Sequence, residues 1–131
     1  MITREADYAI RAVLYLSTEG KEGPVSSLEL SKKMGIPYRF MRRIGLKLQK
    51  CGFIDSRKGK GGGIKLAKKP EQITILDLLK AFDGDGFKLN ECLADGKSCV
   101  RSEKCPIHTQ MGKLQDMIET QLAALSLDKL V

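Results

Sequence analysis

The chain lacks a long hydrophobic run, and it is poor in histidine, the residue most often used for general acid–base catalysis. No stretch approaches the roughly 18 uncharged apolar residues of a membrane span, so we expect a soluble, cytoplasmic protein without membrane contacts. The sequence has a single histidine, and neither a convincing acid–base pair nor a cofactor loop accompanies it. An enzyme acting on a small-molecule substrate therefore finds little support.

The modest length of the chain and its few cysteines set further limits. Its 131 residues can form one domain with a real core and an appendage, but not two independent domains. Four cysteines are present, and thiols stay reduced inside cells. Metal ligation or redox chemistry is therefore expected before a disulfide framework.

What the chain has in excess is positive charge, and this charge is unevenly distributed. The net charge is +7, yet residues 1–70 carry 16 Lys or Arg against 6 Asp or Glu, whereas residues 71–131 carry 7 against 10. So basic a first half is typical of a surface that meets a polyanion such as nucleic acid. Solvated lysines without a role are the alternative.

Residues 26–50 have the pattern of a helix-turn-helix, and a first helix capped by Thr3 precedes them. Ser26 and Glu29 can cap the next helix as a capping box, and Gly35 supplies the positive φ that commonly ends a helix. Another helix then starts at Pro37. Five basic residues lie outside its apolar face: Arg39, Arg42, Arg43, Lys47 and Lys50. Such a second helix is what a helix-turn-helix presents to the DNA major groove.

The segment FIDSRKGKGGGIKLA, residues 53–67, predicts a basic β-hairpin. Apolar residues alternate on either side of a glycine-rich tip, which is typical of two short strands joined by a loop. After a helix-turn-helix, such a hairpin is a wing whose cations Arg57, Lys58 and Lys60 can lie in the minor groove. A phosphate-binding loop is disfavoured because the final Lys-Ser/Thr and a following helix are missing.

The rest of the chain predicts a short helix, a patternless segment and a long last helix. Thr74 can cap the short helix, which ends near residue 82. The last helix runs from Pro106 to about Ser126 with one apolar stripe: Ile107, Met111, Leu114, Ile118, Leu122 and Leu125. We expect this stripe to pack against its copy in a symmetric dimer. The alternative is that the helix folds back on its own domain.

Three cysteines and the histidine follow the spacing C-x6-C-x5-C-x2-H between residues 92 and 108. Structural zinc sites usually take ligands in pairs two to four residues apart, whereas wider spacings suit an iron-sulfur cluster. The spacing favours a cluster over zinc, and redox-active thiols come third. The fourth cysteine, Cys51, lies three residues after Leu48 and is expected in the core.

Five segments together resemble one known family: ITREADYAIRAVLYL, IPYRFMRRI, GKGGGIKLA, TILDLLKAF and the three late cysteines. They are similar to the bacterial winged-helix repressors that include the iron-sulfur assembly regulator IscR and the nitric-oxide-sensing repressor NsrR. The resemblance implies a homodimeric transcription factor. It also implies that Cys92, Cys99 and Cys105 hold a [2Fe-2S] or [4Fe-4S] cluster whose state controls binding to operator DNA.

The resemblance offers two candidates for the fourth cluster ligand. His108 matches the histidine that completes the site in the assembly regulators, and Asp7 matches the aspartate that does so across the dimer in the nitric-oxide sensors. The spacing from Cys105 favours His108 slightly, because residues three apart lie on the same side of a helix start. The first cysteine gap is longer than in the assembly regulators, so the cluster type stays open.

We therefore expect a mainly α fold: a winged helix-turn-helix with a small β-hairpin wing and a long C-terminal dimerisation helix. The expected parts are a DNA-binding domain (1–82), a cysteine-rich cluster-binding loop (83–105) and a dimerisation helix with its tail (106–131). We expect the protein to act as a transcriptional repressor that senses nitric oxide, redox or iron-sulfur status. The alternatives are a cluster-free regulator using zinc or redox-active cysteines, and an electron-transfer or cluster-carrying protein. The residues expected to bind DNA are Ser26, Ser27, Tyr38, Arg39, Arg42, Arg43, Lys47, Arg57, Lys58 and Lys60.

Overall fold

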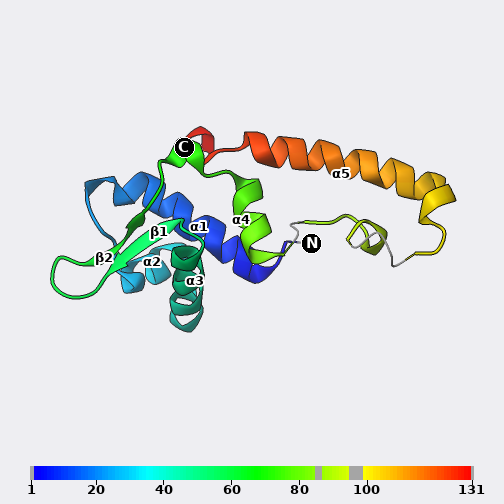
Figure 1. Ribbon diagram of the computed structural model, residues 1–131. Helices are drawn as coiled ribbons and strands as arrows, with labels where there is room; N and C mark the ends of the chain where they lie inside the picture. The colour runs from blue at the N-terminus through cyan, green and yellow to red at the C-terminus, as the bar shows by residue number, and fades with distance from the viewer. Residues whose placement is uncertain (1, 85–86, 95–98, 131) are drawn as a thin grey trace.

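The computed structural model describes residues 2–84, 87–94 and 99–130. Figure 1 shows a cluster of helices with a small hairpin, from which one long helix extends to the side. The helices are α1 (Arg4–Thr18), α2 (Ser27–Met34), α3 (Tyr38–Lys50), α4 (Ile75–Phe82) and α5 (Pro106–Ala124), and the strands are β1 (Ile54–Arg57) and β2 (Gly63–Leu66). None of the described helices combines the length and the apolar character that crossing a bilayer requires. The predicted mainly α fold with a hairpin wing is confirmed.

The core of the winged domain forms around α1, which packs against α2, α3, α4 and β2. One face of α1 is built from small residues, and Ala6, Ala9 and Ala12 are fully buried. The side chains of α3 and α4 fill the space beside this face, with Leu48 and Leu78 among the fully buried residues. Close packing of this kind resists rearrangement, since interiors tolerate few voids.

The helix-turn-helix is fixed by local signals that the sequence predicts. The Ser26 hydroxyl accepts a hydrogen bond of 3.0 Å from the Glu29 amide, and Gly35 ends α2 with φ 64°. The other half of the predicted capping box is replaced by a different contact, because the Glu29 carboxylate accepts from the Tyr15 hydroxyl at 3.3 Å. Helix α3 begins at Tyr38, one residue later than predicted.

The hairpin pairs antiparallel, with Ile54 opposite Leu66 and Arg57 opposite Gly63. Backbone hydrogen bonds of 2.9 and 2.7 Å between Val25 and Ile64 attach it to the entry of α2. Gly63 has φ 145°, and a Cβ there would lie 2.9 Å from the Val25 carbonyl oxygen. Glycine is therefore required where the wing meets the helix-turn-helix.

The C-terminal part both projects from the domain and returns to it. Helix α5 leads back to the domain (Figure 1), and just beyond its end the Ile75 amide donates to the Leu125 carbonyl at 2.9 Å and Leu127 is fully buried. The rest of α5 extends away from the winged domain (Figure 1), and its Ile107 is 65% exposed. The helix ends at Ala124, so Leu125 of the predicted stripe lies beyond it.

The prediction that Cys51 belongs to the core is wrong. Cys51 is exposed and lies at the C-cap of α3. The helix ends at Lys50 and the chain reverses at Gly52, with φ 81°, so helical spacing after Leu48 no longer points inward. Phe53, which is 5% exposed, covers this end of the core instead.

Candidate nucleic-acid interface and cysteine segment

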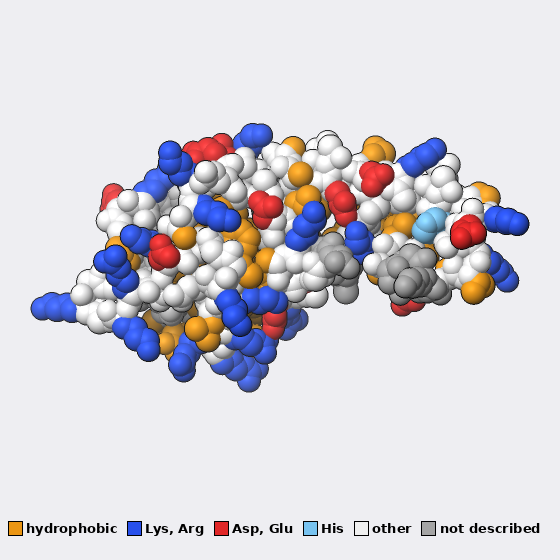
Figure 2. Space-filling view, in the orientation of Figure 1, with side chains coloured by type: hydrophobic (Ala, Val, Ile, Leu, Met, Phe, Trp, Pro, Cys, Tyr) orange, Lys and Arg blue, Asp and Glu red, His pale blue; other side chains and the backbone are white. Residues whose placement is uncertain are grey.

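A groove lies between the start of α2, the outer face of α3 and the hairpin. Its volume is about 520 Å³. Lysine and arginine side chains gather around the end of the molecule where α3 and the hairpin lie, as Figure 2 shows. The residues that line the groove include Ser26, Ser27, Tyr38, Arg42, Gly45, Leu46, Gln49, Ser56, Arg57, Lys58, Gly59 and Gly62. A groove with such a lining suits a polyanion.

Six of the ten residues predicted to bind DNA line this groove: Ser26, Ser27, Tyr38, Arg42, Arg57 and Lys58. The serines lie at the start of α2, where free backbone N–H groups favour a negative charge. Lys60 is exposed in the loop between β1 and β2, outside the groove lining.

The other three predicted residues also lie on α3, where Arg43 and Lys47 contact neighbouring helices and Arg39 lies beside Phe40 of its own helix. Arg43 forms an ion pair with Glu5 of α1. The guanidinium groups of Arg39 and Arg43 lie 5.0 and 5.2 Å from the centre of the Phe40 ring, and the Lys47 ammonium lies 4.7 Å from the Phe82 ring. Cations this close to aromatic rings are attracted by the ring faces. The contacts of Arg43 with Glu5 and of Lys47 with Phe82 attach α3 to α1 and α4.

Three groove residues on α3 were not predicted from the sequence. Gly45, Leu46 and Gln49 share the face of Tyr38 and Arg42, at helical spacings of three and four. Leu46 is 70% exposed. Positive charge does not point to these neutral residues. The signal in the sequence is Leu46, an apolar residue four positions after Arg42 that lies outside the apolar face of the helix.

The three late cysteines are free thiols, each half-buried. Cys92 lies in a short 3₁₀ turn, Glu91–Leu93, and Cys105 is the N-cap of α5, where its sulfur accepts from the His108 amide at 3.5 Å. Residues 85–86 and 95–98 of the predicted loop lie outside the described residues. Within the described part of the chain, no three Cys, His, Asp or Glu side chains lie close enough together to hold a metal ion.

The two candidates for the fourth ligand differ in their surroundings. The Nδ1 atom of His108 is buried and has no hydrogen-bond partner among the described residues. The Asp7 carboxylate instead forms an ion pair of 2.7 Å with Arg11, one turn later on α1. A buried nitrogen without a partner is costly unless it binds a ligand. The donor set therefore fits an iron-sulfur cluster chemically, with thiols and an available imidazole nitrogen.

Comparison with known proteins identifies the family. The family model for Rrf2 proteins, described as an iron-dependent transcriptional regulator, matches residues 2–131. The chain belongs to the Rrf2 family. Among the curated relatives of this Rrf2 protein is the HTH-type transcriptional regulator IscR of Aliivibrio salmonicida (strain LFI1238), 30% identical over 131 residues, which cover 99% of this chain and 76% of the relative. Another is the HTH-type transcriptional regulator NsrR of Shouchella clausii (strain KSM-K16), 31% identical over 124 residues, or 94% of this chain and 78% of the relative.

A solved structure shares the fold. The structure titled "T. potens IscR" aligns with a TM-score of 0.80 at 22% identity, over 99% of this chain and 85% of the other. The family resemblance predicted from the sequence is confirmed. These relatives are transcriptional regulators and not enzymes, as expected. The chain is accordingly a transcriptional regulator of the Rrf2 family.

Proposed function

We propose that this Rrf2 protein is an iron-sulfur-cluster-dependent repressor that binds operator DNA as a homodimer in the cytoplasm. The cluster state would report nitric oxide, redox conditions or iron-sulfur supply. The observation that carries the proposal is the groove between α2, α3 and the hairpin, which gathers basic and hydrogen-bonding side chains on one face. Residues 1–82 would bind DNA, 83–105 the cluster, and 106–131 the second subunit.

The residues that line the groove are suited to contacting different parts of the DNA. Arg42 is suited to a guanine edge, Gln49 to an adenine edge, and Leu46 to a thymine methyl group. Ser26 and Ser27 would bind phosphates at the start of α2. The wing cations Arg57, Lys58 and Lys60 would contact the minor groove or the backbone.

Helix α5 is suited to dimerisation. Three of its apolar side chains are strongly exposed: Ile107 is 65%, Leu114 48% and Met117 65% exposed. Exposed apolar residues along one helix are typical of a partner surface. A symmetric pairing of two α5 helices would cover them and set the spacing of two recognition helices for a pseudo-palindromic operator.

The cysteine segment, residues 83–105, is suited to holding the cluster. Cys92, Cys99 and Cys105 would be ligands, and the unpartnered Nδ1 of His108 makes it a better fourth ligand than Asp7, whose carboxylate Arg11 already binds. When bound, a cluster of this kind supplies iron that reacts with oxidants and nitric oxide. Cys105 caps α5, where its sulfur accepts a hydrogen bond from the His108 amide. A change at Cys105 would therefore act directly on the start of the dimerisation helix.

The test is anaerobic purification followed by ultraviolet-visible and Mössbauer spectroscopy. The wild type should show cluster absorbance and a defined iron signature, and Cys92→Ala, Cys99→Ala and Cys105→Ala should each abolish the absorbance. Cys51→Ala, at the exposed end of α3, is the matched control and should keep it. Colour and operator affinity that survive in all three variants would overturn the proposal.

A second candidate is a cluster-free regulator whose cysteines bind zinc or oxidise directly. The described cysteines do not converge on a metal-binding point, and this observation favours direct oxidation over zinc binding. Metal analysis of the anaerobic protein distinguishes the two, since zinc without sulfide would support the second candidate. An electron-transfer or cluster-carrying role gains no support from the relatives, which are transcriptional regulators.

A further inference from the structure

Helix α5 contains one buried residue among its described side chains, and that residue is polar. Gln115 is 5% exposed. Burying an amide side chain is unfavourable unless its hydrogen bonds are satisfied. The position of Gln115 therefore depends on what it binds.

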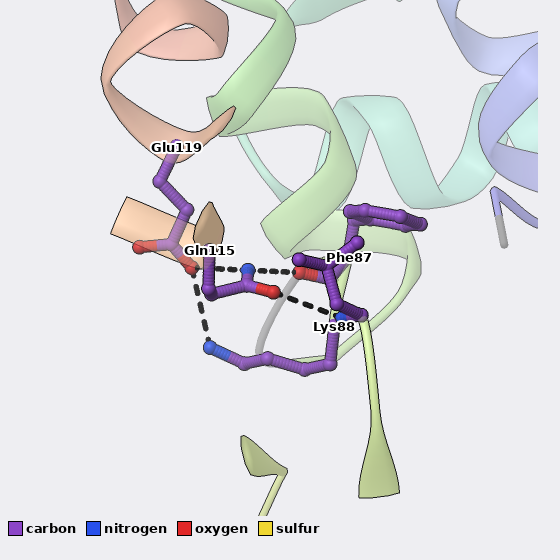
Figure 3. A network of polar contacts seen from close by, with 5 residues as sticks. Phe87, Lys88, Gln115 and Glu119 are labelled. Carbon is purple, nitrogen blue, oxygen red and sulfur yellow. Dashed lines mark hydrogen bonds and ion pairs between the residues drawn. The ribbon is translucent and has the colours of Figure 1, made fainter. Parts of the chain in front are cut away.

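Gln115 binds the backbone at the start of the cysteine segment, as Figure 3 shows. Its Nε2 donates to the Phe87 carbonyl at 2.6 Å, and its Oε1 accepts from the Leu89 amide at 2.9 Å. The same Nε2 donates to the Glu119 carboxylate at 3.0 Å, and that carboxylate also binds the Lys88 ammonium at 3.2 Å. We call these four contacts, together, the Gln115 clamp.

The clamp is connected to Cys92 by a short, hydrogen-bonded path. Asn90 follows Leu89 directly and caps the 3₁₀ turn that contains Cys92, since its side-chain oxygen accepts from the Glu91 amide at 2.9 Å. The Leu93 amide donates to the Asn90 carbonyl at 3.0 Å. This turn also contacts α5. The backbone fixed at Leu89 therefore determines where the Cys92 thiol lies.

The clamp also lies on the side of α5 that carries His108. Residues seven apart on an α-helix share one face, separated by two turns or about 10 Å. His108 and Gln115 have this spacing, and Glu119 lies one further turn along the same face. The segment bound at Gln115 thus runs beside the helix face from which His108 projects.

We propose that Gln115 is a positioning residue that holds residues 87–89 against α5 and so sets the place of Cys92 relative to Cys105 and His108. The inference rests on the proposed function, because it concerns the residues that would hold the cluster. Gln115 need not touch the cluster itself. Its effect is transmitted through the backbone of the cysteine segment.

The test measures the alkylation rate of each cysteine in the reduced, metal-free protein, with iodoacetamide as the probe and mass spectrometry of peptides as the readout. Gln115→Leu keeps the volume of the side chain and removes its hydrogen bonds. We expect it to raise the rate at the half-buried Cys92 by about fivefold or more, the factor that a modest loss of local stability produces. The rate at the exposed Cys51 should stay unchanged in the same sample.

The matched control is Gln121→Leu, the same substitution at an exposed glutamine of α5, which should leave both rates unchanged. Gln115→Glu is a second variant, because it keeps the shape and loses the donor to the Phe87 carbonyl; circular dichroism checks that both variants fold. It should also accelerate alkylation of Cys92. Equal rates at Cys92 in folded Gln115→Leu or Gln115→Glu protein and in Gln121→Leu would overturn the inference.

A second readout uses the cluster-loaded protein and distinguishes this inference from the proposed function. Gln115→Leu should lose its visible absorbance in air faster than the wild type and Gln121→Leu. If the wild type holds no cluster, the proposed function fails, while the alkylation rates still decide whether Gln115 positions Cys92. If the cluster forms and decays equally in all three proteins, Gln115 has no positioning role.

Discussion

The winged domain and the cysteine segment are held in place by different means. A continuous apolar core fixes α1, α3 and α4, and the fully buried Leu48 and Leu78 belong to it. Residues 87–89, by contrast, are attached to α5 by the buried amide of Gln115 and by one ion pair from Lys88, and only the partly buried Phe87 among them packs against the core. A close-packed core gives a rigid DNA-binding surface, whereas a segment held by a few polar contacts and one partly buried ring can rearrange at lower cost. If the proposed function holds, a rigid DNA-binding domain is joined to a cysteine segment that rearranges more easily.

The largest expected effect tests the rigid half of this comparison. Leu48→Ala should lower the free energy of unfolding by about 2–5 kcal/mol, because it leaves a cavity in the core. Leu46→Ala, on the exposed face of the same helix, should change it by less than about 0.5 kcal/mol. Urea denaturation measures both. Similar losses in the two variants would mean that α3 is not packed as described.

A substitution on α5 tests whether the projecting helix is a subunit interface. Leu114→Asp places a charge in the exposed apolar stripe and should weaken the dimer by about 2 kcal/mol or more, as expected for a residue near the centre of an interface. Sedimentation at several concentrations measures the change. Thr120→Asp carries the same charge on another exposed part of α5 and should leave association unchanged. A monomeric wild type would refute the dimer directly.

Substitutions of Arg42 and Arg43 test which of the basic residues of α3 bind DNA. Arg42 lines the groove, so Arg42→Ala should lose about 1–3 kcal/mol of affinity for an operator selected from random DNA. Arg43 is paired with Glu5, so Arg43→Ala should affect operator affinity less, and should lower stability by no more than about 1 kcal/mol. Fluorescence anisotropy and urea denaturation provide the two measurements. A larger loss of operator affinity in Arg43→Ala than in Arg42→Ala would show that Arg43 separates from Glu5 and contacts DNA.

The smallest expected effect concerns the polar attachment of the cysteine segment. The hydrogen bond from Gln115 holds the pKa of Glu119 below its ordinary value, burial opposes this, and Lys88 reinforces it. A lowered pKa contributes stability above the ordinary glutamate value of about 4.3, and this contribution is lost as the pH falls through the lower folded value. Glu119→Gln should therefore cost less than about 1 kcal/mol at pH 6, and this cost should shrink as the pH falls below the ordinary glutamate value. If the difference in free energy of unfolding between the wild type and Glu119→Gln grew in acid, the contacts assigned to Glu119 would be contradicted.

Local signals in the sequence were sufficient to predict the helix-turn-helix and the wing. Ser26, Gly35 and Thr74 act within one turn of their own helices, so their roles follow from spacing alone. The contacts of Arg43 and the burial of Gln115 join segments far apart in the chain, and no local pattern encodes them. Positive charge alone did not predict which cations line the groove, because the contact that holds Arg43 at Glu5 joins residues far apart in the sequence.

The cysteine segment was predictable in composition but not in geometry. The spacing of its thiols indicated a cluster or a metal, and His108 proved to have an unpartnered buried nitrogen. In the positioning role proposed for Gln115, the place of Cys92 depends instead on this residue, which periodicity would assign to the surface because its neighbours on α5 are polar or exposed. Tertiary contacts, not sequence spacing, decide the arrangement of such ligands.

Operator affinity with and without the cluster tests the central claim most directly. One anaerobic preparation is divided, half is stripped of iron with a chelator, and both halves are titrated with the selected operator and with unrelated DNA at one salt concentration. The account predicts operator affinities that differ by about tenfold or more, the coupling expected between linked sites, while affinity for unrelated DNA stays the same. Equal operator affinities in the two halves would contradict it.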